Sequence, residues 1–245
     1  MRKQLWWYIG FFVILLAGFF YFTLRDQDFS KSPLAVINPD IQNFSFINQN
    51  SRTITDKDVE GKVYVAAFFF TTCKGICPRM NANMRRVFDA YKEEPGFMIL
   101  SHTCMPETDS IPLLKKYERM MINGTLIRSQ DGSYHIDHDP NDTSAIDATA
   151  NPNWNFVTGN KTDLYKMARQ SYLIDNNKPD SAQNIADQFI HTQFFALVDK
   201  QRRLRGIYDG LRGYEVEKLI EDIKDLLKEK VDHKHFMNGF SNTPN

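Results

Sequence analysis

The chain has 245 residues, enough for one sizeable domain with additional segments. Thirty lysines and arginines balance thirty aspartates and glutamates, so no overall basic field indicates a protein dedicated to binding nucleic acid. Three cysteines are too few for a disulfide-stapled mini-domain, because they allow one internal bridge and leave an odd thiol.

The N-terminal segment predicts a membrane anchor. Residues 5–24 carry no charge, and as a helix they would extend about 30 Å, the thickness of the hydrocarbon core of a bilayer. Arg2 and Lys3 precede this run, which predicts that residues 1–4 are cytoplasmic and that the following domain lies on the periplasmic side of a bacterial cell membrane. A cleaved signal peptide is the alternative. The length of the run and the absence of an A-x-A-type site after it favour a single-pass anchor.

The rest of the chain predicts one domain. Residues 25–39 are polar and are expected to form a linker, residues 40–230 to form the domain, and residues 231–245 to form a polar tail. Apolar runs and helical periodicity, taken in chain order, give its elements. We expect strands at residues 43–50, 62–70, 97–101, 154–157, 194–198 and 204–208, and helices at residues 78–91, 111–121, 161–172 and 216–227.

An insertion rich in Asn, Asp, Ser and Gly occupies residues 123–153. A loop of this length is usually functional or mobile. Within it, Asp131-Gly132 between residues 126–128 and 134–136 predicts a small hairpin. The order of elements outside the insertion is typical of a thioredoxin-like α/β domain, with a central mixed sheet flanked by helices.

Two of the three cysteines, Cys73 and Cys77, lie just beyond the apolar run of residues 62–70 and just before Pro78, a favourable first residue of a helix. The positive end of that helix is expected to lower their pKa. Cysteines four apart on a helical turn can form a redox-active disulfide or ligate one metal ion, and two thiolates suit Cu(I) or Zn. A purely structural disulfide is a third alternative, although so short a loop would contribute little stability.

Three segments resemble the SCO/SenC family of membrane-anchored, thioredoxin-like copper chaperones. The run FFFTTCKGICPRM resembles the family's cysteine motif, ILSHTCMPETDSIPLLKKY the segment after it, and DQFIHTQFFALVDKQRRLRGIYDG the histidine segment. The chain departs from the family at Met105 and Ile190, where many relatives carry aspartate.

The resemblance implies a function. In that family two cysteines and a histidine bind a copper ion, and the protein helps to build the binuclear copper site of cytochrome c oxidase. Carried over, the metal ligands would be Cys73, Cys77 and His191, and the partners would be the copper-binding oxidase subunit and a thiol reductant protein. The alternative is a membrane-anchored thiol–disulfide oxidoreductase in which Cys73 and Cys77 keep partner cysteines reduced. The CxxxC spacing argues against that reading, since thioredoxin-type catalysis generally uses CxxC.

Other residues are weaker candidates. Cys104 and Met105 are soft donors that follow a predicted strand, so an auxiliary copper contact is one reading and a buried bystander thiol the favoured one. His102 is expected in the core. His135 and His138 lie among aspartates, where a solvated acidic loop is favoured over a divalent-ion site.

The arginines of the predicted turn between the last two strands are expected to be solvated, or to dock an acidic partner. They are Arg202, Arg203 and Arg205.

Overall fold

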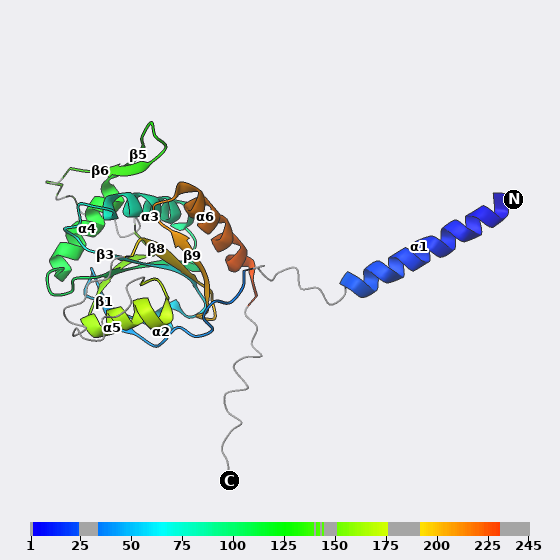
Figure 1. Cartoon of the computed structure of the whole chain (residues 1–245), viewed down its shortest axis with the longest axis horizontal. Coiled ribbons are helices and arrows are strands. Elements are labelled where there is room, and N and C mark those ends of the chain that lie inside the picture. The colour runs from blue at the N-terminus through cyan, green and yellow to red at the C-terminus, as the bar shows by residue number, and fades with distance from the viewer. Residues whose placement is uncertain are drawn as a thin grey trace, which may run out of the picture.

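The computed structural model describes residues 2–24, 34–139, 141–142, 144, 151–175 and 192–230 of the chain, with its elements arranged as in Figure 1. The helices are α1 (Arg2–Leu24), α2 (Asp56–Val59), α3 (Cys77–Tyr91), α4 (Ile111–Asn123), α5 (Lys161–Lys166), the π-helix η1 (Met167–Ser171) and α6 (Gly213–Lys228). The strands are β1 (Ser45–Asn48), β2 (Thr53–Thr55), β3 (Val63–Phe69), β4 (Phe97–Thr103), β5 (Thr125–Arg128), β6 (Tyr134–Asp137), β7 (Trp154–Thr158), β8 (Phe194–Val198) and β9 (Leu204–Asp209).

Seven strands form one mixed sheet in the order β2-β1-β7-β4-β3-β8-β9. The central strands β3, β4 and β7 are parallel, and β8, β9, β1 and β2 are added in antiparallel pairs at the two sides. Every residue of β3 and β4 is buried, as expected for central strands that helices cover on both faces. The predicted mixed sheet flanked by helices is therefore confirmed.

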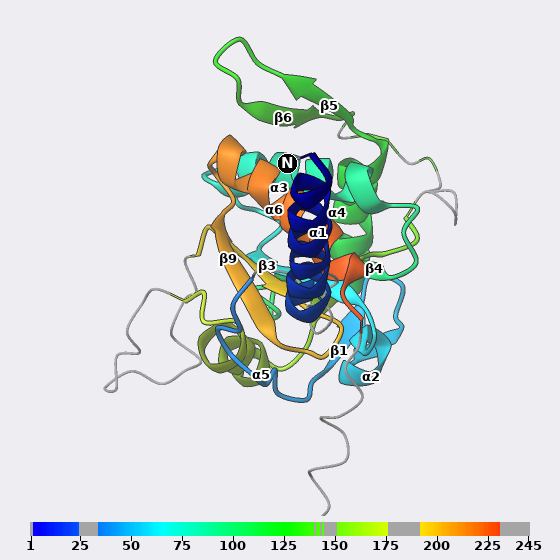
Figure 2. The same cartoon turned by 90° about the vertical axis from the view of Figure 1, so that its right-hand side faces the viewer.

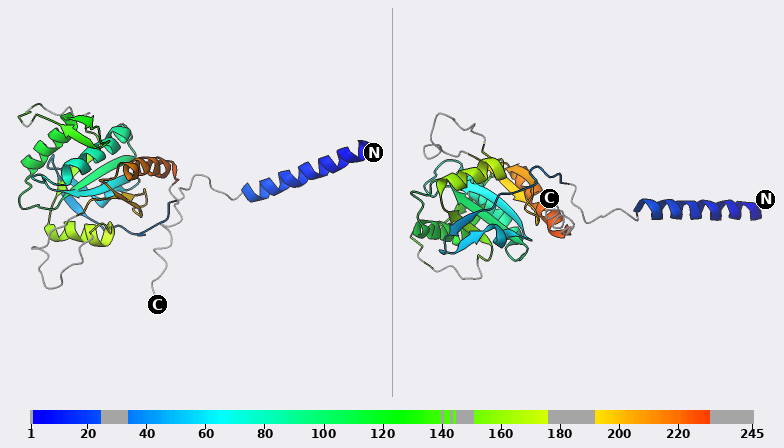
Figure 3. Two further views of the ribbon diagram at one scale, coloured as in Figure 1. Left: turned by 45° about the horizontal axis from the view of Figure 1, so that its top comes forward. Right: turned by 90° about the horizontal axis from the view of Figure 1, so that it is seen from below.

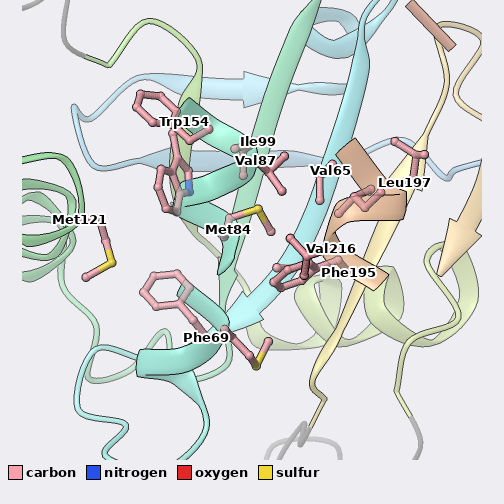
Figure 4. Packing of buried hydrophobic residues seen from close by; sticks show 14 of the residues in the cluster. Val65, Phe69, Met84, Val87, Ile99, Met121, Trp154, Phe195, Leu197 and Val216 are labelled. Atoms are coloured by element: carbon pink, nitrogen blue, oxygen red, sulfur yellow. The ribbon is translucent and has the colours of Figure 1, made fainter. Parts of the chain in front are cut away.

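Two apolar cores lie on the two faces of this sheet. Helices α3, α4 and α6 cover one face, where Val65, Met84 and Val216 pack together, as the close view in Figure 4 shows. Helix α5, η1 and α2 lie on the other side, where Phe68 and Tyr172 belong to the second core (Figures 2 and 3). The alternation of side chains along a strand thus sends neighbouring residues of β3 into different cores.

The β5–β6 hairpin stands outside the main sheet and lies over α3 and α4 (Figure 2). Its strands pair from Thr125↔Asp137 to Arg128↔Tyr134, which confirms the hairpin predicted inside the 123–153 insertion. The guanidinium carbon of Arg86, on α3, lies 4.5 Å from the centroid of the Tyr134 ring. This cation–π contact ties the hairpin to the helix that begins at the cysteines.

The structure differs from the sequence-based expectation in three places. Short elements β2 and α2 occupy residues 53–59, where none was predicted. The single helix expected over residues 161–172 is an α-helix that widens into the π-helix η1, with Tyr172 N donating to Met167 O. The last part of the predicted linker is tied to the domain, since Ile37 N donates to Leu204 O at 2.8 Å.

The predicted anchor falls on α1, whose side chains the structure describes over residues 6–22. Among the described residues, no helix is both long enough and apolar enough to cross a membrane. The membrane anchor therefore stays a prediction.

Candidate redox and metal site

The two cysteines of the CxxxC motif lie where β3 ends and α3 begins. Cys73 is half-buried in the connecting loop, and its N–H donates to the carbonyl of Phe70 at 3.2 Å, which closes a tight turn. Cys77 is the first residue of α3 and is 4 % exposed. Carboxyl ends of parallel strands are where α/β sheets place ligands, so the motif occupies the expected edge of the sheet.

Both cysteines are free thiols, and Cys73 packs against the core cluster that contains Cys77. Burial raises the pKa of Cys77 to about 12, and the hydrogen bond to Cys73 and the nearby Cys73 charge add to the rise. The expectation that the helix end lowers the pKa is therefore wrong for Cys77. Desolvation outweighs the helix dipole because the side chain points into the core on the α3 face of the sheet.

Cys104 lies close by but on the other face. Its N–H donates to the carbonyl of Phe69 at 2.8 Å, so it follows the last paired residues of β3 and β4 directly. Its side chain belongs to the second core, and burial, followed by the charges of Cys77 and Asp109, raises its pKa well above the usual range. The reading of Cys104 as a buried thiol is confirmed. Within the described ranges, no three His, Cys, Asp or Glu side chains are grouped closely enough to hold a metal ion.

A buried carboxylate joins the two loops that leave this edge of the sheet. Asp109 is 1 % exposed, and its Oδ1 accepts a hydrogen bond from Thr71 Oγ1 at 2.6 Å. The N–H of Thr71 lies 3.3 Å and 3.4 Å from its two oxygens, and Thr103 Oγ1 donates to Oδ2. Sequence reasoning missed Asp109, since an acid in a polar run after a strand is typical of a solvated loop.

Tyr117 of α4 lies beside the cysteine pair and was also missed. Its ring stacks on Phe69 at a centroid distance of 4.9 Å, and Asn81 Nδ2 donates to its hydroxyl at 2.6 Å. Burial raises the pKa of Tyr117, with further contributions from the charges of Cys77 and Cys73. The cysteine pair is thus backed by a neutral, hydrogen-bonded phenol.

His191, the third ligand implied by the family resemblance, lies outside the described residues, so its place stays a prediction. The chain resumes at Thr192, which is 5 % exposed, and then enters β8. Since β8 runs antiparallel to β3 with Ala196 opposite Ala66, its first residue lies at the end of β3 from which the cysteine loop departs. Thr192, the first described residue after the gap, therefore lies near the edge of the sheet where the cysteine loop begins.

The other histidines singled out in the sequence lie on β4 and in or beside the β5–β6 hairpin. His102 is fully buried, stacks on Phe68 at 5.0 Å and meets Phe46 edge-on, which confirms its place in the core. His138 lines an open cavity of about 500 Å³ at the base of the hairpin. His135 is exposed on β6, where Ser129 Oγ lies 3.2 Å from its Nδ1.

The expectation of a solvated or docking arginine turn between β8 and β9 is wrong. Arg205 is 4 % exposed, and its Nη1 lies 2.7 Å from Asp199 and 2.8 Å from Glu229. Arg202 pairs with Asp56 at 3.2 Å. These cations fasten the turn to neighbouring parts of the domain, because a buried guanidinium needs carboxylate partners.

A mixed sheet with a CxxxC pair at the junction of its central strand and the next helix defines a thioredoxin-like domain. The SCO1/SenC family model matches residues 38–126 and 130–228. The chain therefore belongs to the SCO1/SenC family, which confirms the resemblance seen in its sequence.

Known relatives agree with this membership. The SCO1 protein homolog of Bacillus subtilis (strain 168) is 28% identical over 196 residues, which cover 79% of this chain and 84% of the relative. The solved structure of BsSco, described as a member of the Sco family of cytochrome c oxidase assembly proteins with a disulfide switch, is 25% identical. It has a TM-score of 0.59, with coverage of 82% of this chain and 100% of BsSco. ScoI of Bradyrhizobium japonicum, solved with copper bound, is 19% identical with a TM-score of 0.51 and coverage of 77% and 99%, which shows a shared fold.

Proposed function

We propose that this protein is a copper-binding metallochaperone that delivers copper to the binuclear copper site of cytochrome c oxidase. Cys73, Cys77 and His191 are its proposed ligands. The observation that carries the proposal is the pair of free thiols, Cys73 and Cys77, at the sheet edge of a SCO1/SenC chain. Copper is the cargo in this reading, and the copper-binding oxidase subunit is its recipient.

The chemistry of the pair suits this role. Two soft sulfur donors favour Cu(I), and a neutral imidazole would complete a three-coordinate site. Thiols must lose their protons to ligate a metal, and the raised pKa of Cys77 makes this loss depend on the metal itself. The half-exposed Cys73 gives an incoming copper ion or partner its point of entry, after which Cys77 can join the coordination.

Copper stoichiometry of the reduced full chain in detergent tests the proposal. We expect one Cu(I) per chain for the wild type, and loss of tight binding in Cys73→Ser and in His191→Ala. Cys104→Ser is the matched control, because that thiol is buried in the other core and should leave the stoichiometry unchanged. Equal copper binding by wild type and Cys73→Ser would contradict the proposal.

A thiol–disulfide oxidoreductase is the second candidate, favoured by the unequal exposure of the two cysteines. Cys73 is accessible to attack by a partner, while Cys77 is buried behind it in the place of a resolving thiol. A reductase assay on His191→Ala separates the two functions. Retained thiol turnover would support catalysis, whereas loss of copper with no turnover would support copper transport. A thiol reductant protein would be needed in both cases, because an oxidised pair cannot bind copper.

We further propose that residues 5–24 anchor the protein in the cell membrane, with the domain on the periplasmic side. The uncharged run, the preceding Arg2 and Lys3, and the helical structure of α1 support this reading. Cell fractionation tests it: the full chain should sediment with membranes, and the chain from residue 34 onward should not. External protease should digest the domain in intact spheroplasts.

A further inference from the structure

Hydrogen bonds from Thr71 and Thr103 to the Asp109 carboxylate, here called the Thr71–Asp109–Thr103 bridge, join the loops that follow β3 and β4. Phe69 and Thr103 are the last paired residues of β3 and β4, and each strand is followed by a loop. The loop after β3 runs through Thr71 to Cys73, and the loop after β4 runs through Asp109 to α4. Asp109, in the loop after β4, thus accepts hydrogen bonds from Thr71 in the loop after β3 and from Thr103 at the end of β4.

The bridge is buried and fully formed. Thr71 gives Asp109 both its N–H and its hydroxyl, and Thr103 gives its hydroxyl while accepting the N–H of Met105 at 3.0 Å. The N–H of Asp109 in turn donates to the carbonyl of Met105 at 2.9 Å. Each group has a partner, so the bridge behaves as one rigid unit rather than as separate surface contacts.

We propose that Asp109 is a positioning residue that, through Thr71, holds the Cys73 thiol within reach of the Cys77 thiol. Thr71 lies two residues before Cys73, and the turn that presents Cys73 starts at Phe70, so fixing Thr71 fixes the entrance of that turn. Asp109 touches neither sulfur in this reading and is not a ligand. The inference deepens the proposed function, because the same pair would bind copper or form the disulfide.

Removing the Asp109 carboxylate should change two equilibria, the binding of Cu(I) and the reduction of the Cys73–Cys77 disulfide. Residues that orient metal ligands from behind typically contribute about 10- to 100-fold to metal affinity. The Cys73–Cys77 disulfide should also become easier to reduce, because two thiols held less closely form it less readily. In the exchange with dithiothreitol, two electrons and two protons pass from the reductant to the disulfide, which becomes two thiols while dithiothreitol closes to its own disulfide.

The experiment uses full-chain variants in detergent. Asp109→Ala removes every acceptor, Thr71→Val removes one hydroxyl donor, and Thr71→Ser keeps both donors as the conservative rescue. Asp58→Ala is the matched control, since Asp58 also accepts the N–H and the hydroxyl of a threonine, Thr55, both at 2.9 Å. It precedes β3, so the whole strand of seven residues separates it from the cysteine loop.

Cu(I) affinity is measured by competition with a chromogenic chelator, and the disulfide equilibrium by titration with reduced and oxidised dithiothreitol. We expect Asp109→Ala to bind Cu(I) at least about tenfold more weakly and to form the disulfide at least about tenfold less readily. The second change corresponds to about 30 mV in the reduction potential of this two-electron couple. Thr71→Val should change both in the same direction, and Thr71→Ser should match the wild type. Asp58→Ala should lower the unfolding free energy while leaving both equilibria unchanged.

The outcomes separate the two proposals. Wild-type values in Asp109→Ala and Thr71→Val would overturn the positioning role, and so would equal losses in Asp58→Ala, which would show a general effect of lost stability. If Asp109→Ala does not fold, the comparison of Thr71→Val with Thr71→Ser decides alone. If the wild type binds no copper, the proposed metallochaperone function fails, and the dithiothreitol equilibrium still tests the role of Asp109.

Discussion

The unequal environments of the cysteines predict selective labelling of the reduced protein. An ordinary thiol with a pKa of about 8.5 is roughly one quarter thiolate at pH 8. With a pKa of about 12, Cys77 is thiolate only about once in ten thousand molecules at that pH. Nucleophilicity rises with pKa, so the thiolate of Cys77 is about 40-fold more nucleophilic than that of an ordinary thiol. The smaller thiolate fraction and the higher nucleophilicity together give a labelling rate about 60-fold below that of an ordinary thiol.

Iodoacetamide labelling followed by peptide mass spectrometry measures these rates. The full chain is reduced, freed of copper by a chelator and labelled at pH 8 beside a cysteine peptide of ordinary pKa. Initial labelling at Cys77 should be about 60-fold slower than in the peptide, and it should rise about tenfold for each unit of pH. In urea all three cysteines should react alike. Folded Cys77 that reacts as fast as the peptide would refute the claim that burial controls its pKa.

Other predictions concern stability. Burial lowers the pKa of His102 to about 4, so below pH 6.5 the unfolded chain takes up a proton that the folded chain does not. The free energy of unfolding should therefore fall by about 2 kcal/mol between pH 7.5 and pH 5 through this residue, and His102→Phe should remove that part in urea titrations at both pH values. Gly210→Ala should destabilise the fold by about 1–3 kcal/mol, because its Cβ would lie 2.6 Å from Phe195 Cζ and 2.8 Å from the carbonyl oxygen of Gln193. Gly75→Ala meets nothing within 4 Å and should melt like the wild type, and a similar melting point for both variants would contradict this packing.

Much of the fold is predictable from the sequence because its signals are local. The continuous apolar run of β3, the helical period of α3 and the Asp131-Gly132 turn each report a structure within a few residues. Elements β2 and α2 are three and four residues long, too short for any period to emerge. No sequence pattern distinguished the π-helix η1 from the α-helix that precedes it.

The candidate site is only partly predictable, because its chemistry depends on burial. The motif locates Cys73 and Cys77, yet it does not reveal whether the helix end or desolvation controls the pKa of Cys77. Asp109 and Arg205 sit in polar runs that are typical of solvated loops, and only the packed fold shows that both are enclosed with partners. Buried polar residues with partners from distant parts of the chain therefore escape a prediction based on local sequence alone.

The placement of Cys104 has a consequence for how the protein matures. The Cys104 side chain belongs to one core and the Cys77 side chain to the other, so the two thiols pack on opposite faces of the sheet although they are near in space. Once the sheet has formed, we expect oxidation to give a single bridge, between Cys73 and Cys77. An oxidant that arrives before the strands have assembled meets three equivalent thiols, and two of the three possible pairings would trap a misfolded chain.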